Sequence, residues 1–107
     1  MRPSLARTAP VFAALGDETR LGIIATLCTH GPQSIARLTE TTEVTRQAVT
    51  KHLELLEEAG VIRSEREGRE RIWSVEPQRL GEAQRYLDQI SQQWDKALDR
   101  LRAMVED

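Results

Sequence analysis

The stretch TRQAVTKHLELLEEAG, residues 45–60, decides the fold, because it has the features of a helix with both of its ends. Thr45 is a good N-cap residue, since its hydroxyl can accept a hydrogen bond from the first helical turn. Gly60 suits the position just beyond the C-terminus, where the backbone adopts a positive φ. At 100° per residue, one side of this helix is apolar and is expected to be buried. That side carries Val49, Leu53 and Leu56.

The other side of the first half of this helix is polar and contains no acid. Gln47, Ala48 and Lys51 lie opposite the apolar side, and the same half of the helix also carries Arg46, Thr50 and His52. The acidic residues Glu54, Glu57 and Glu58 are confined to the second half. The positive N-terminal end of the helix next to Thr45 therefore suits a phosphate, and the side chains that follow suit base edges.

Shorter helices are expected before this stretch. Asp17 is a credible N-cap for a helix that continues to Gly31, and Ser34 can cap a second helix that buries Ile35 and Leu38. In the first of these helices, an apolar set at helical spacing is expected to face the core; it comprises Leu21, Ile24, Ala25 and Cys28. Ahead of it, Val11, Phe12 and Leu15 indicate one or two amphipathic turns, and Thr41-Thr42-Glu43-Val44 is expected to break the second helix.

After Gly60 the apolar pattern changes to a period of two. The runs VIRSERE and RERIWSV flank a turn at Gly68, which predicts a β-hairpin that Pro77 closes. The tip of this hairpin is rich in arginine, namely Arg66, Arg69 and Arg71. An alternative reading is a solvated hairpin whose alternating Arg and Glu residues pair across the strands.

From Arg79 onward the chain is expected to form one long helix. Its apolar residues recur at alternating steps of three and four, which is the spacing of a helix that pairs with another helix. Together with Phe12 near the N-terminus, the residues expected at a dimer interface are Leu80, Leu87, Ile90, Trp94, Leu98 and Leu101. Trp94 and Tyr86 have a second interpretation as the lining of a ligand pocket, although aromatic residues are enriched in dimer cores.

Length and composition limit the other classes of protein. A chain of 107 residues suits a single domain over residues 1–107, which we divide into a DNA-binding core, residues 10–77, and a dimerisation helix, residues 79–106. The one cysteine excludes an internal disulfide framework and four-cysteine zinc sites, and no apolar run is long enough to span a membrane. With no secretory signal pattern at the N-terminus, the expected location is the cytoplasm. No Gly-rich phosphate loop or nucleophile elbow is present, so we do not expect an enzyme.

The expected fold is mainly α with a small β-hairpin, in the order of a winged helix-turn-helix with N- and C-terminal dimerisation helices. Such a fold places its second helix in the major groove of double-stranded DNA and its wing along the backbone. The net charge is only −2, and residues 33–71 carry seven basic and eight acidic residues, so charge placement rather than bulk charge must create a DNA surface. The near-neutral balance motivates an alternative, a winged-helix dimer that binds another protein.

Three stretches, LGDETRLGIIATL, VTRQAVTKHLELLEEAGVI and EREGRERIWSV, resemble the ArsR-type bacterial transcriptional regulators in order and spacing over about residues 10–76. The resemblance implies a homodimeric winged-helix repressor that binds operator DNA and releases it on a signal. Twofold pairing of such a protein would read an inverted repeat. Carried over by position, it implies recognition-helix contacts by Thr45, Gln47, Ala48, Thr50, Lys51 and His52. It implies wing contacts by Arg66, Arg69 and Arg71.

The chain departs from the metal-sensing members of that family. Residues 34–39 contain no cysteine, and the C-terminal helix has Asp88, Asp95 and Asp99 but no histidine, so we expect no metal site and no cofactor. The stretch YLDQISQQWDKALDRLRAMVE instead resembles a subgroup whose genes often neighbour a small START-like ligand-binding protein. A small-molecule effector is compatible with this pattern, and the sequence does not identify it.

Two further residues have competing interpretations. Cys28 and His30 lie on different helix faces without a third ligand nearby, so Cys28 is expected to be a small core residue. His52 lies at the edge of the buried face of its helix, which suits both a hydrogen-bonded boundary histidine and a phosphate donor.

Overall fold

The computed structural model describes residues 5–106, so residues 1–4 and 107 of the expected domain lie outside it. The described chain is mainly helical with a small three-stranded sheet. Its elements are α1 (Leu5–Leu15), α2 (Glu18–His30), β1 (Gln33–Ser34), α3 (Ile35–Glu40), α4 (Arg46–Glu58), β2 (Ile62–Glu67), β3 (Glu70–Val75) and α5 (Pro77–Glu106).

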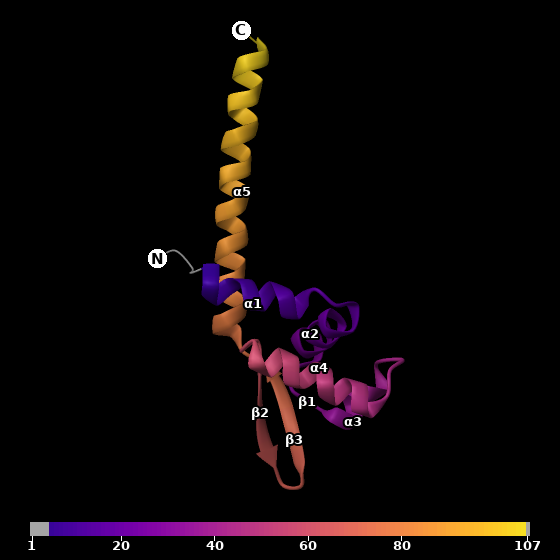
Figure 1. Cartoon of the computed structure of the whole chain (residues 1–107). Coiled ribbons are helices and arrows are strands. Elements are labelled where there is room, and N and C mark those ends of the chain that lie inside the picture. The colour runs from indigo at the N-terminus through magenta and orange to yellow at the C-terminus, as the bar shows by residue number, and fades with distance from the viewer. Residues whose placement is uncertain (1–4, 107) are drawn as a thin grey trace.

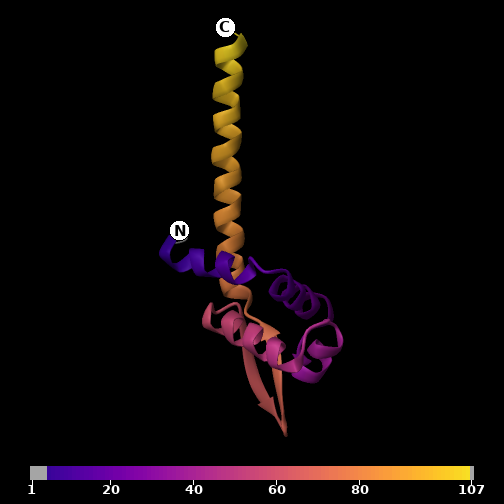
Figure 2. The same cartoon turned by 45° about the vertical axis from the view of Figure 1, so that its right-hand side comes forward.

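The molecule is elongated, with extents of 67 × 30 × 22 Å. Its first four helices and the sheet form a body from which α5 projects as a single straight rod (Figures 1 and 2). The β2–β3 hairpin points away from the body in the opposite direction to the free end of α5. The two segments expected to contact DNA and a partner subunit therefore lie at different ends of the molecule.

The first helix is longer than the sequence indicated. It runs for 11 residues and includes Pro10, whereas one or two turns around Val11–Leu15 were expected. Its buried face is formed by Thr8, Val11 and Ala14, which follow each other at steps of three residues. Proline in the sixth position of a helix removes one backbone hydrogen bond, which is why the sequence did not favour a helix through it.

The second helix is capped as predicted but buries a different face. The Asp17 carboxylate accepts a hydrogen bond from the backbone N–H of Arg20 at 3.0 Å. The buried residues are Ile23, Ile24 and Leu27, whereas Leu21 is 53% exposed. The expected inward positions of Leu21, Ala25 and Cys28 are therefore wrong, and so is the core role for Cys28. Apolar residues occur on most sides of this helix, so periodicity does not single out the face that packs.

The helix-turn-helix is formed by α3 and α4, and both are capped as predicted. The hydroxyl of Ser34 accepts from the N–H of Arg37, and that of Thr45 accepts from the N–H of Ala48. At the other end of α4, Gly60 has a φ of 79°, and its N–H donates to the carbonyl of Glu57. The N–H of Val61 donates to the carbonyl of Leu56, which completes a Schellman motif.

The sheet has the order β1-β3-β2, and both strand pairs are antiparallel. The β2–β3 hairpin matches the sequence prediction, whereas the two-residue strand β1 was not predicted, since two residues show no period. In the hairpin, Glu67 pairs with Glu70, which leaves Gly68 and Arg69 as the turn. Gly68 has a φ of 63°, and no described residue other than glycine has a positive φ, so this turn has the backbone pattern of type II′.

One hydrophobic core unites the body. The predicted apolar face of α4 is fully buried in it, since Val49, Leu53 and Leu56 are each 0% exposed. The other elements contribute Val11, Ala14, Ile23, Ile24, Leu27, Leu38, Val61, Ile62, Trp73 and Ala83. The outer face of α4 is therefore fixed relative to the hairpin by the packing of its inner face.

The first turns of α5 pack against α1. The helix begins at Pro77, two residues before the predicted start, because proline is favoured in the first helical turn. The guanidinium of Arg7 donates to the carboxylate of Glu82 at 2.8 Å, and this hydrogen bond lowers the pKa of Glu82 below its ordinary value. The rings of Phe12 and Tyr86 lie 6.2 Å apart. These contacts fix the direction in which α5 leaves the body.

Candidate nucleic-acid interface

The outer face of α4 presents most of the residues that the sequence singled out. Thr45, Arg46, Gln47, Thr50 and Lys51 are exposed, whereas Ala48 and His52 are partly buried. The hydroxyl of Thr45 is used as the N-cap, and that of Thr50 donates to the carbonyl of Arg46. The side chains that remain free for a ligand on this face are therefore led by Gln47 and Lys51, one helical turn apart.

These residues surround a shallow, open hollow on the surface. Its lining comprises Thr45, Gln47, Ala48, Thr50, Lys51 and Glu54. Glu54 was not among the predicted contacts, although its position three residues after Lys51 places both on one face of a helix. The hollow thus has a cation, an amide and a methyl group on the side of the helix N-terminus, and an acid on the far side.

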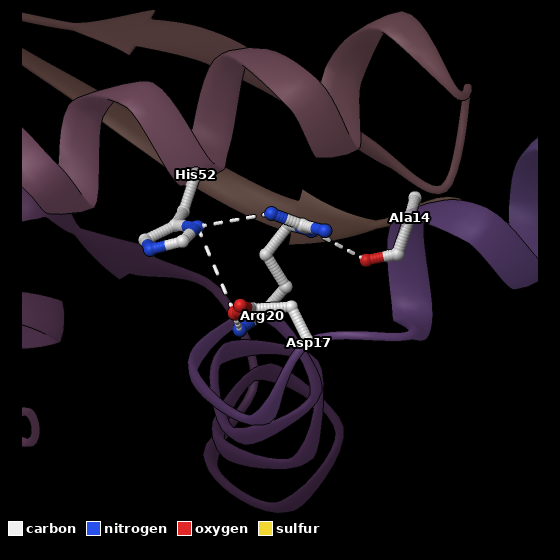
Figure 3. A network of polar contacts seen from close by, with 4 residues as sticks. All are labelled: Ala14, Asp17, Arg20 and His52. Atoms are coloured by element: carbon white, nitrogen blue, oxygen red, sulfur yellow. Dashed lines mark hydrogen bonds and ion pairs between the residues drawn. The ribbon is translucent and has the colours of Figure 1, made fainter.

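His52 is tied to the helix before the helix-turn-helix (Figure 3). Its Nδ1 lies 3.3 Å from a terminal nitrogen of Arg20 and 3.9 Å from a carboxylate oxygen of Asp17. Nε of Arg20 donates to the carbonyl of Ala14 at 2.6 Å, so a single guanidinium contacts both α1 and α4. This arrangement places His52 at the boundary of the core, in agreement with one of its two predicted roles.

The three arginines of the wing, defined as the β2–β3 hairpin, are all exposed. Arg69 lies in the turn, and Arg66 is the direct partner of Arg71 across the two strands. Because side chains alternate along a strand, Arg66 and Arg71 share the face that carries the buried residues Ile62 and Trp73. This face is the one that turns toward α4, since its Ser64 bonds with Glu57.

The acids of the wing lie on its other face. Alternation places Glu65, Glu67 and Glu70 together there, opposite Arg66 and Arg71. Arginine is thus paired with arginine across the strands, and Glu67 with Glu70. A hairpin with Arg–Glu pairs directly across its strands, the alternative reading of the sequence, is therefore wrong. Among the described residues, the ion pair that the hairpin makes is between Arg63 and Glu76, at the base of the wing.

The residues predicted at a dimer interface fall into two groups. Phe12 and Leu80 are partly buried against the core of their own chain. The others lie on the part of α5 that extends beyond the body, here called its free part, and are exposed: Leu87, Ile90, Trp94, Leu98 and Leu101. Tyr86 packs on Phe12, whereas Trp94 is 65% exposed. Trp94 and Tyr86 therefore do not line one pocket within this chain.

Known proteins resemble this chain in both sequence and fold. A helix-turn-helix domain family matches residues 15–65. The HTH-type transcriptional regulator Rv2034 of Mycobacterium tuberculosis is 30% identical over 95 residues, which cover 89% of this chain and 85% of the relative. An ArsR-like transcriptional regulator from Rhodococcus sp. RHA1 superposes with a TM-score of 0.78 at 36% identity, over 92% of each chain. This chain belongs to the ArsR-type winged helix-turn-helix transcriptional regulators.

Membership of the ArsR-type regulators assigns a role to two parts of the fold. In this class α3 and α4 form the helix-turn-helix of a DNA-binding domain, and the β2–β3 hairpin is the wing. A further relative, the arsenical resistance operon repressor of Bacillus subtilis, is 40% identical over 63 residues, which cover 59% of this chain and 57% of that protein.

Two kinds of feature are absent from the part of this ArsR-type chain that the structure describes. No cluster of three or more His, Cys, Asp or Glu side chains arranged to hold a metal ion occurs within residues 5–106. In the same part of the chain, no helix has the length and apolar character needed to cross a membrane.

Proposed function

We propose that this ArsR-type regulator acts as a homodimer that binds an inverted-repeat operator and represses its own or a neighbouring operon. The observation that carries the proposal is the outer face of α4, where an acid-free first half is exposed beside an arginine-bearing wing face. The repressor role is proposed by analogy with the Bacillus subtilis relative, which is an arsenical resistance operon repressor.

The outer face of α4 has side chains that match base edges in the major groove. An amide such as Gln47 can pair with adenine, an ammonium such as Lys51 with guanine, and the methyl of Ala48 can contact that of thymine. Thr45 and Arg46 lie at the positive end of the helix, where a backbone phosphate is favoured. We therefore assign sequence reading to the middle of this face and phosphate contact to its N-terminal edge.

The wing supplies phosphate contacts beside the groove. Arg69 occupies the turn, while Arg66 and Arg71 share the face that turns toward α4. Two guanidiniums held on one face repel each other, and a phosphate between or beside them relieves that repulsion. We assign no base reading to these three arginines, so their contribution should be the same for every DNA sequence.

The free part of α5 needs a partner. This helix has 30 residues, or about 45 Å at 1.5 Å per residue, and its exposed apolar residues recur every three or four positions. In water such a stripe favours pairing with a second copy of itself, because pairing buries both stripes. Twofold pairing would place two α4 helices on one duplex, with half-sites about one helical turn, roughly 10 bp, apart or a multiple of that.

In this role, residues 10–77 would form the DNA-binding core and residues 79–106 the dimerisation helix. A protein with this role works where the DNA lies, which in a bacterium is the cytoplasm. Its chemistry is binding rather than catalysis, and the relatives are likewise named as transcriptional regulators.

Selection of bound duplexes from a random library tests the proposal. The expected result is an enriched inverted repeat whose half-site spacing is close to a whole number of helical turns. Retention on heparin that falls steeply with salt should accompany it, because phosphate contacts release counterions. No enriched sequence together with no salt-sensitive retention would favour a winged-helix module that binds another protein.

A further inference from the structure

Two hydrogen bonds connect the second half of α4 to the wing. The hydroxyl of Ser64 in β2 donates to a carboxylate oxygen of Glu57 in α4 at 3.2 Å. A terminal nitrogen of Arg71 in β3 donates to the same hydroxyl at 2.8 Å. Three elements are thereby joined through Ser64, which lies diagonally across the strands from Arg71.

The direction of each hydrogen bond follows from the groups involved. An ionised carboxylate only accepts hydrogen bonds, so the single proton of the Ser64 hydroxyl is committed to Glu57. The lone pairs of the hydroxyl then face Arg71, whose guanidinium uses one of its five N–H donors. The other four donors remain available, which leaves Arg71 able to bind a phosphate oxygen while it is held by Ser64.

Without a restraining contact, electrostatic repulsion would displace the guanidinium of Arg71. It is the direct cross-strand partner of Arg66, and like charges in that position repel each other. Among the described residues no acid forms an ion pair with either arginine. The contact with Ser64 is the hydrogen bond that restrains the guanidinium of Arg71 toward α4.

We propose that Glu57 is a positioning residue, which acts through Ser64 to hold Arg71 in the angle between α4 and the wing, ready for a DNA phosphate. This inference rests on the proposed function. It assigns a DNA-binding role to a carboxylate, which by its charge alone opposes a polyanion. Loss of the Glu57 side chain therefore has opposite expected effects under the two views, weaker binding if it positions Arg71 and tighter binding if it is only a negative charge.

Glu58 provides a matched control. It is exposed on the same helix one residue further along, and its carboxylate has no hydrogen bond or ion pair to another described residue. Glu57→Gln supplies the second comparison, because a glutamine amide keeps an oxygen that can accept from Ser64 while it removes the charge.

The experiment measures the dissociation constants of these variants on the selected operator by fluorescence anisotropy, with circular dichroism and sedimentation to confirm fold and oligomeric state. Glu57→Ala should weaken binding about 3- to 10-fold, the range expected for the loss of one of the two hydrogen bonds that connect Glu57 to Arg71. Ser64→Ala should do the same, whereas Glu57→Gln and Glu58→Ala should bind at least as tightly as the wild type. In an Arg71→Ala background, Glu57→Ala should no longer weaken binding.

The inference is overturned if Glu57→Ala binds as tightly as the wild type or tighter, if Ala and Gln at this position behave alike, or if the effect persists without Arg71. Failure of the wild type to bind any selected duplex would instead refute the proposed function. The two failures are distinguishable, because the first appears only in variants of a protein that binds DNA.

Discussion

The guanidinium of Arg20 lies 3.3 Å from Nδ1 of His52, so α2 and the recognition helix α4 are joined by polar groups as well as by the core. The Asp17 carboxylate caps α2 by accepting from the backbone N–H of the same Arg20, and this hydrogen bond holds the pKa of the carboxyl below its usual value. The cap of α2, the helix that carries Arg20, therefore depends in part on the ionised form of Asp17.

Asp17→Asn should make the protein less sensitive to acid. Because folding lowers the pKa of Asp17, its contribution is fully present above the pKa of the unfolded chain and is lost as the pH falls through the folded value. Asparagine keeps the cap but does not titrate, so the unfolding midpoint of the variant should decline less than that of the wild type below about pH 4. Thermal melts at pH 7 and at pH 3 measure this, and an identical decline in both proteins would contradict it.

Alanine substitutions at two glycines should change the free energy of unfolding in opposite directions. Gly60 has a φ of 79°, and a Cβ there would lie 3.1 Å from Nε of Arg79, so Gly60→Ala should lower the free energy of unfolding by about 1–2 kcal/mol. Gly22 lies within α2, and a Cβ there meets no atom within 4 Å. Gly22→Ala should therefore raise that free energy by roughly 0.5–1 kcal/mol. Urea titrations test the pair, and the account of these glycines is wrong if both changes have the same sign.

A carboxylate in the exposed stripe of α5 should separate the subunits. Leu87→Glu would place two charges in the proposed dimer seam, whereas Gln92→Glu adds the same group to an exposed position off the stripe. Sedimentation should show a monomer for the first variant and a dimer for the second, and the monomer should lose operator binding. A dimeric Leu87→Glu protein would rule out the seam.

Arg69→Ala should weaken binding to all duplexes alike. The side chain lies in the wing turn, where it can reach a phosphate but is assigned no base. The slope of log affinity against log salt should become shallower by about one unit. Titrations of the operator and of an unrelated duplex over a range of salt measure both effects, and a change confined to the operator would show that Arg69 reads sequence.

The helix ends were predictable because each depends on a few neighbouring residues. Asp17, Ser34 and Thr45 accept the capping hydrogen bonds that the sequence indicated, and Gly60 ends α4 as expected. The buried face of α4 was also predictable, since its apolar residues lie on one side. These features are local, so the order of residues contains most of the information.

The remaining features depend on contacts between distant residues. The face that α2 buries is selected by packing, because Leu21 and Ile23 are equally apolar but only Ile23 is buried. The strand register decides that Arg66 pairs with Arg71 rather than with a glutamate. The contact of His52 with Arg20 spans 32 residues and has no local signal. For the same reason, the sequence did not reveal that Glu57 and Arg71 both bond to Ser64.

The central claim is that the outer face of α4 reads bases, and a comparison of the two lysines tests it most directly. Lys51→Ala and Lys96→Ala remove the same charge, one from the hollow of α4 and the other from the exposed surface of α5. On the selected operator, Lys51→Ala should cost about 1–3 kcal/mol of binding free energy and relax specificity at one base pair, while Lys96→Ala should change little. Equal affinities for Lys51→Ala and the wild type would contradict the claim.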